Sequence, residues 1–212
     1  MPEDASMSSG IDWRELVVVV VLSVTAIATA WTGFQASKWG GAMSISFSKA
    51  SSARIEAARL DGAANRRQTI QVSLFTQWLA AYQNHDSQLT TFLEARFPEP
   101  LATAFPVWIK SQPLTSPGAA ATPFELPEYA IPEQAQSAAA DARADAEFAQ
   151  ALDDNQRGDN YTVLTVAFAT VLFFAALSSR MKGPTSQWVL LSIALVGFFV
   201  CAGFLLAFPK LV

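Results

Sequence analysis

Three long apolar segments without a charged residue constrain this chain more than any other feature of its sequence. They run from Leu16 to Phe34, from Tyr161 to Ser179 and from Trp188 to Phe208. A helix needs about 20 apolar residues to cross the hydrocarbon core of a bilayer, and each segment is close to that length. Because lipid offers the backbone no hydrogen-bond partners, segments that span it must bond internally as helices. The sequence therefore predicts an all-α integral membrane protein with three transmembrane helices.

Composition agrees with this prediction and excludes several other classes of protein. Only 15% of the 212 residues are charged, whereas soluble domains have about 25%. The net charge of −4 leaves no basic excess to neutralise phosphates, so no nucleic-acid partner is expected. With one cysteine and one histidine, the sequence predicts neither an intramolecular disulfide nor a zinc site, and it indicates no cofactor.

The connection between the second and third segments predicts the orientation. Residues 180–187 contain Arg180 and Lys182 and no acid, which favours the cytoplasmic side. The tail 1–15 is then cytoplasmic, residues 35–160 are extracytoplasmic, and 209–212 form a short tail. Ala28-Thr29-Ala30 resembles a signal-peptide cleavage site, but the leader before it is acidic, whereas secretory leaders are normally basic.

Residues 35–160 are predicted to form a helical hairpin domain. From Ser44 to Phe97 there is no proline and apolar residues recur at helical spacing, and helix resumes from Glu133 with an interruption at Gly158. Between them, residues 98–132 hold eight of the chain's eleven prolines. We expect this proline-rich loop to contain one short helix, from Leu101 to Lys110, and to pack on the face around Trp78 and Tyr82.

Two rows of small residues predict how the hairpin helices meet. We expect close packing between two seams, one made of Ala50, Ala53 and Ala57 and the other of Ala138 and Ala142, with paired residue numbers summing to about 195. Residues 38–67 carry six basic and two acidic side chains, whereas residues 125–159 carry nine acidic and two basic ones. We expect ion pairs between these two stretches to set the register of the hairpin helices. The alternative is two solvated faces of opposite charge that never meet.

A ridge of small residues on the first segment predicts helix association inside the membrane. It consists of residues at four-residue steps, namely Thr25, Thr29, Gly33, Ser37 and Gly41. Helix contact in lipid depends on close packing, which small side chains permit. The partner would be a helix of the same chain or of a second copy in a homo-oligomer.

No pattern in the sequence predicts catalysis. Acidic, basic and histidine side chains are absent from the three apolar segments, which argues against ion-coupled transport. We interpret His85 as a surface residue and Cys201 as a packing residue. Glu125, Glu128 and Glu133, like Asp153, Asp154 and Asp159, do not follow a calcium-loop spacing.

The sequence therefore favours a non-enzymatic structural, accessory or scaffold protein. One alternative is a pore-forming channel subunit lined by Thr25, Thr29, Gln35 and Ser37, since conduction does not require charges within the membrane. Another is a membrane enzyme that binds anionic headgroups through Arg54, Arg66 and Arg67, although no acid–base partner accompanies them.

Four stretches carry a resemblance to a known family. They are TAWTGFQASKW at 29–39, LFTQWLAAY at 74–82, PFELPEY at 123–129 and GDNYTVLTVAFATVLFFAALSSR at 158–180. With these, the chain resembles a family of bacterial three-pass membrane proteins that has no established activity. The resemblance covers nearly the whole chain and implies a bacterial plasma membrane, with no catalytic residues to carry over.

Overall fold

A computed structural model describes residues 13–113, 115–116 and 118–211, and the elements in these ranges are all helical. They are α1 (Trp13–Gln83), α2 (Ser87–Glu94), α3 (Leu101–Lys110), the short 3-10 helix η1 (Pro123–Glu125), α4 (Pro132–Arg180) and α5 (Pro184–Ala207). The predicted all-α class is confirmed, as is the short helix within the proline-rich loop. Most of the predicted cytoplasmic tail, residues 1–12, lies outside the described residues, as does Val212.

Helices α1, α4 and α5 are each long and apolar enough to span a membrane. Their most apolar windows have mean hydropathies of 2.1, 2.0 and 2.7, yet only 17% to 28% of each window is buried within the protein. Because apolar surface left open to water would be costly, these exposed faces fit contact with lipid. The prediction of three apolar helices with the dimensions of membrane spans is confirmed.

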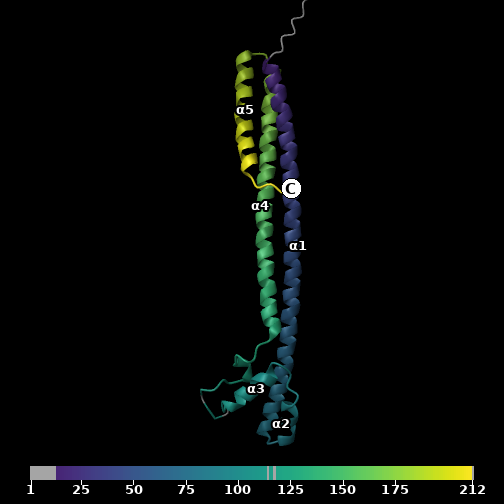
Figure 1. Ribbon diagram of the computed structural model, residues 1–212, viewed down its shortest axis with the longest axis vertical. Coiled ribbons are helices and arrows are strands. Elements are labelled where there is room, and N and C mark those ends of the chain that lie inside the picture. Colours follow the sequence, from purple (N-terminus) through teal and green to yellow (C-terminus); the bar gives the residue numbers. More distant parts are fainter. Residues whose placement is uncertain (1–12, 114, 117, 212) are drawn as a thin grey trace, which may run out of the picture. The chain divides into compact units, whose positions relative to one another are not determined.

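The chain divides into two compact units, and α1 and α4 contribute to both. Residues up to Ser48 and from Phe148 onward form the first unit, which we call the membrane unit. Lys49–Glu147 form the second, which we call the lobe unit. Within each unit, α1 and α4 lie side by side (Figure 1).

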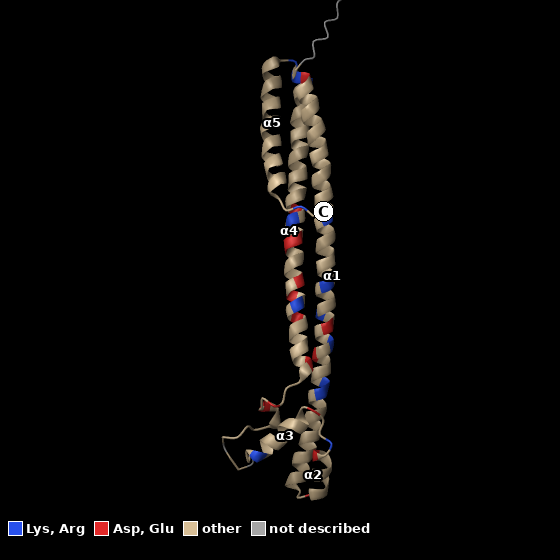
Figure 2. Cartoon of the chain, viewed as in Figure 1, with Lys and Arg blue, Asp and Glu red and all other residues tan. Residues whose placement is uncertain are grey.

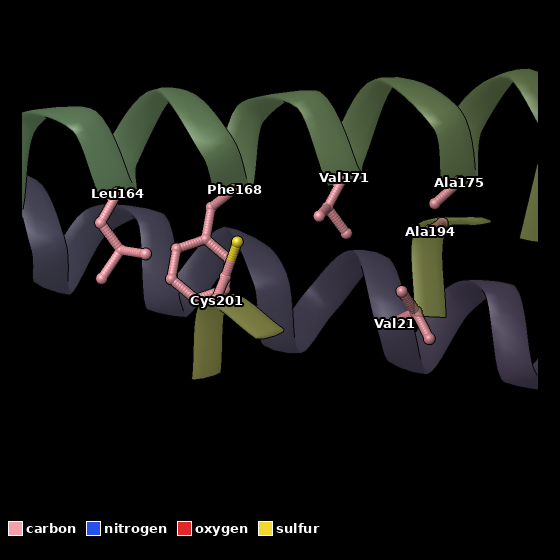
Figure 3. Packing of buried hydrophobic residues seen from close by; sticks show 7 residues of the cluster. All are labelled: Val21, Leu164, Phe168, Val171, Ala175, Ala194 and Cys201. Atoms are coloured by element: carbon pink, nitrogen blue, oxygen red, sulfur yellow. The ribbon is translucent and has the colours of Figure 1, made fainter. Parts of the chain in front are cut away.

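The core of the membrane unit is made by side chains from three helices. Phe168 of α4 is fully buried and lies beside Cys201 of α5, and Val21 of α1 belongs to the same cluster, nearer Ala175 and Ala194 (Figure 3). Gly197 brings α5 close to α4, since an added Cβ would lie 3.1 Å from Val171 Cγ2. Thus α5 is fixed to the α1–α4 pair by close packing, which is the main source of helix association in lipid.

The lobe unit is built around an aromatic cluster. Its buried residues come from α1, α2, α3 and the segment between the last two, namely Phe75, Trp78, Leu93, Phe97, Leu101, Phe105 and Trp108. Phe124, Leu126 and Tyr129 of the proline-rich loop are partly buried against it. The prediction that this loop packs around Trp78 is therefore confirmed. Tyr82 stacks on Trp78 with ring centroids 5.3 Å apart.

Two local predictions about helix breaks are wrong. Helix α4 continues through Gly158, because one glycine costs a helix only about 1 kcal/mol and packing can outweigh it. The chain instead breaks at 84–86, inside the region predicted to be helical. There His85 adopts a positive φ of 57°, and the Asp86 side chain caps α2 by accepting a hydrogen bond from the Leu89 amide.

Candidate functional site

The α1–α4 seam of the lobe unit uses the predicted small residues on α1 but a different face of α4. Ala50 and Ala57 are buried and Ala53 is half-buried, as the prediction requires. On α4, however, Ala138 and Ala142 are exposed, so the predicted seam is wrong for these two residues. The buried positions are Ser137, Ala140 and Ala144. Alanine is common at nearly every position of this stretch, and composition alone therefore could not identify its inner face.

The register between the two helices follows the predicted pairing. Ser137 donates a hydrogen bond to the Ala57 carbonyl oxygen across 3.0 Å, and these residue numbers sum to 194. Ion pairs between the helices join Arg54 to Asp141 and Asp145, Arg67 to Glu133, Lys49 to Glu147 and Arg143 to Glu56. Exposed pairs of this kind contribute about 0–1 kcal/mol each, so they specify alignment more than stability.

The predicted ridge on α1 does not form one contact surface. Thr25 is fully buried and Thr29 is half-buried, but Gly33, Ser37 and Gly41 are exposed. A Cβ added to Gly33 or Gly41 would meet no described atom within 4 Å. Each four-residue step turns about 40° around a helix, so the ridge turns away from the neighbouring helices. The buried face of α1 instead repeats every seven residues, at Val18, Thr25, Thr32, Trp39 and Ser46.

Polar side chains inside the membrane unit bond to one another and to the segment after α5. The Thr165 hydroxyl of α4 donates to the Thr32 hydroxyl of α1 at 2.8 Å. Gln35, which is fully buried, donates from Nε2 to the Leu211 carbonyl oxygen at 3.1 Å and accepts at Oε1 from the Leu211 amide at 3.0 Å. The Tyr161 hydroxyl donates to the Pro209 carbonyl oxygen at 3.1 Å. These bonds join α4 to α1 and hold the segment after α5 to both of them.

A second set of polar side chains in the membrane unit lies near Trp39. The Arg157 guanidinium lies over the Trp39 ring, 4.7 Å from its centroid, and 3.5 Å from Asp154 Oδ1. An added Cβ on Gly158 would lie 3.6 Å from the Ala36 carbonyl oxygen, in ordinary contact. Gly158 therefore lies against α1 with room for a Cβ, and it does not cause the helix break predicted from sequence. In the membrane unit, charged side chains lie beyond the two ends of a long uncharged stretch (Figure 2).

The residues considered for chemistry belong to different units or are engaged in other contacts. His85 is exposed in the lobe unit, whereas Cys201 is buried in the membrane unit. The described residues contain no group of three or more histidine, cysteine, aspartate or glutamate side chains that could hold a metal ion. Arg54 and Arg67, considered for headgroup binding, are held in ion pairs with α4. Of the four side chains considered for lining a pore, Thr25 and Gln35 are buried while Ser37 is exposed, so the four do not share a face.

Sequence reasoning missed the interhelical roles of Gln35, Tyr161 and the segment from Pro209 to Leu211. A seven-residue repeat that passes through Thr25, Thr32 and Trp39 was the available signal for the inner face of α1. The bonds to Pro209 and Leu211 had no such signal, because they depend on where the end of α5 lies in space.

Comparison with known proteins identifies no relative of this chain. No protein-family description matches the chain, and no curated protein or solved structure shows a significant similarity to it. The resemblance to bacterial three-pass membrane proteins therefore stays a prediction.

Proposed function

We propose that this chain is a non-enzymatic multi-pass protein of the bacterial plasma membrane with a structural or accessory role. The observation that supports this most is how the interior polar groups of the membrane unit are used. Thr32, Gln35 and Tyr161 bond across helices or to the segment after α5. Side chains used in this way hold helices together and are not arranged around a space for substrate.

Orientation follows from the short connection between α4 and α5. Arg180 and Lys182 favour the cytoplasm for this connection, and the lobe unit is then extracytoplasmic. Cysteine labelling tests this orientation in spheroplasts. Ser186→Cys should react with a membrane-impermeant maleimide only after lysis, whereas Thr115→Cys should react in intact spheroplasts. The reverse pattern would refute the orientation.

Self-association is the second part of the proposal. Gly33, Ser37 and Gly41 leave a smooth exposed surface on α1, with open space next to both glycines. Small residues on an exposed helix face permit a second helix in lipid to approach closely. The exposed part of the ridge, from Gly33 to Gly41, therefore supports contact with a second copy.

The oligomer mass of the detergent-solubilised protein tests this contact. Gly33→Leu should lower the mass relative to the wild type, since a leucine would hold the helices apart. Ala176→Leu enlarges an exposed alanine on α4 and should leave the mass unchanged. Equal masses for wild type and Gly33→Leu would show that this surface does not mediate association.

The pore-forming alternative has less support, because Thr25 and Gln35 are buried within a single chain. Planar-bilayer recordings of the purified protein separate the two functions. We expect no unitary currents, and reproducible currents would replace the accessory role with a conducting one.

A further inference from the structure

One exposed side of α1 in the lobe unit carries two arginines and two isoleucines. Ile55 and Ile70 are 62% and 58% exposed, and Arg59 and Arg66 are exposed as well. Because each residue turns a helix by about 100°, these four side chains lie within about 60° of one another around α1. The buried alanines of the α1–α4 seam lie on the other side. We call the side with these four residues the outer face.

The two arginines of the outer face differ from the other basic residues of α1 in the lobe unit. Lys49, Arg54 and Arg67 each form an ion pair with a carboxylate of α4. Within the part of the chain that the structure describes, Arg59 and Arg66 form neither an ion pair nor a hydrogen bond. The outward arginines are thus left without the acidic partners that the others have.

The acids nearest in the sequence are engaged elsewhere. Glu56 pairs with Arg143 of α4 at 3.0 Å, and Asp61 accepts a hydrogen bond from Asn65 at 3.0 Å. The outer face therefore presents positive charge beside exposed apolar side chains. Arginine is enriched at protein interfaces relative to the rest of the surface, so this combination favours a contact surface.

A hollow lies between the arginines on this face. It has a volume of about 570 Å³, and its lining includes Ile55, Arg59, Gly62, Ala63 and Arg66. A Cβ added to Gly62 would lie 3.3 Å from Arg66 Nη1, so the Arg66 side chain reaches back over the bare backbone of Gly62. Small residues leave room for a second helix to pack closely, with its ridges in the grooves of α1.

A second copy of this chain is a poor partner for the outer face. In a two-fold contact the same surface patch faces itself. A parallel pairing would place Arg59 against Arg59, and an antiparallel one would place Arg59 against Arg66. Because like charges held together disfavour a complex, the complementary partner is a different chain that supplies acids.

We propose that the outer face binds an acidic amphipathic helix of another protein. Arg59 and Arg66 are two helical turns apart, about 10.5 Å along the axis, so carboxylates two turns apart on the partner would meet both. Apolar side chains of the partner contact Ile55 and Ile70, and Gly62 permits close approach. This inference rests on the accessory role proposed above, but it does not depend on orientation or self-association.

Synthetic helices offered to the full-length protein in lipid nanodiscs test this surface, with empty nanodiscs as the background. One peptide has two glutamates seven residues apart, and a second has the same composition with the glutamates on opposite faces. Side-chain cross-links keep both helical. Surface plasmon resonance should show about tenfold tighter binding of the first, since only it can meet both arginines. Equal affinities, or binding by neither peptide, would overturn the proposal.

Charge reversal assigns the two arginines. A variant with both Arg59→Glu and Arg66→Glu should lose the glutamate peptide and bind a third peptide that has lysines in place of the glutamates. Misfolding could not produce this exchange of partners. Lys110→Glu reverses an exposed charge on α3 and should bind like the wild type. An unchanged preference in the double variant would refute the role of the arginines.

Filling the hollow tests whether the partner helix approaches closely. Gly62→Leu should weaken binding of the glutamate peptide about tenfold, because the added side chain occupies the space between the helices. Only the far end of the Arg66 side chain has to move. Ala142→Leu enlarges an exposed alanine on α4 and should have no effect. Equal affinities for Gly62→Leu and the wild type would show charge attraction without helix packing, contrary to the proposal.

Other occupants of the outer face give different results. A lower oligomer mass in the double arginine variant would show that a second copy covers the face. Displacement of the peptide by inorganic phosphate at equal concentration would show a site for small anions. Either result would overturn the proposal. If no peptide binds and bilayer recordings stay silent, only the docking surface is refuted, whereas unitary currents would refute the accessory role itself.

Discussion

The hydroxyl of Ser137 on α4 bonds to the carbonyl oxygen of Ala57 on α1, across 3.0 Å and in the buried seam of the lobe unit. The two residues are 80 positions apart in the sequence. Their contact fixes both the register of the antiparallel pair and the face that α4 turns toward α1. Ala140 and Ala144 follow on that face, whereas Ala138 and Ala142 lie outside it.

Leucine at the two kinds of alanine position should separate the observed seam from the predicted one. Ala144→Leu should destabilise the lobe unit by about 1–3 kcal/mol, because a close-packed seam has no room for the added carbons. Ala138→Leu should change stability by less than about 0.5 kcal/mol, as exposed substitutions usually do. Hydrogen exchange of the α4 amides measures both effects. A larger loss of protection in Ala138→Leu would show that α4 presents the other face.

Gln35 should control how firmly the end of α5 is held. Gln35→Leu removes both bonds to the Leu211 backbone and leaves the half-buried Leu211 amide and carbonyl oxygen without this partner, at about 1–3 kcal/mol. The Leu211 amide should then exchange its hydrogen about tenfold faster or more. Gln150→Leu serves as a control, because Gln150 is exposed and bonds only within α4. Equal exchange at Leu211 in Gln35→Leu and the wild type would exclude this role.

Trp108 should stabilise the proline-rich loop as well as the aromatic core. Its ring is almost fully buried and packs edge-on against Phe75, and its indole N–H donates to the Ala120 carbonyl oxygen at 2.9 Å. Trp108→Ala should cost about 3–5 kcal/mol, as truncation of a buried tryptophan does. Limited proteolysis should then cut the loop between residues 112 and 122 much sooner. Phe92→Ala truncates a half-exposed ring and should leave the cleavage rate nearly unchanged.

Tyr129 should make the lobe unit sensitive to alkali. Burial raises the pKa of its hydroxyl above the ordinary value of 10.0, although the nearby Arg67 charge lowers it in part. Because the folded pKa is the higher one, the neutral form stabilises the fold below pH 10, and this contribution is lost as the pH rises through the folded pKa. Tyr129→Phe should flatten the fall in stability above pH 10, measured by hydrogen exchange of α3. The same fall in both proteins would contradict this assignment.

The predictions that succeeded from sequence rest on local patterns with strong physical causes. An uncharged apolar segment near 20 residues long has few stable alternatives to a membrane helix, so Leu16–Phe34, Tyr161–Ser179 and Trp188–Phe208 were identifiable without coordinates. The short helix from Leu101 to Lys110 was likewise identifiable, since its apolar residues follow helical spacing among prolines. Opposite charges on the two hairpin helices indicated their register.

Predictions failed where the local sequence is compatible with more than one helix face or backbone conformation. A four-residue step and a seven-residue repeat both pass through Thr25 of α1, and only packing against α4 selects the second. The break at His85 and the continuity at Gly158 show the same limit, because neither residue dictates a conformation by itself.

The sequence by itself thus determined that three segments are long and apolar enough to span a membrane and that the backbone is helical, because both follow from the summed chemistry of long segments. The tertiary structure alone decided which face of each helix is buried and which polar groups pair, as Gln35 does with Leu211 and Ser137 with Ala57. Those choices depend on a few ångströms of distance between residues far apart in the chain, and such distances exist only after the helices have packed.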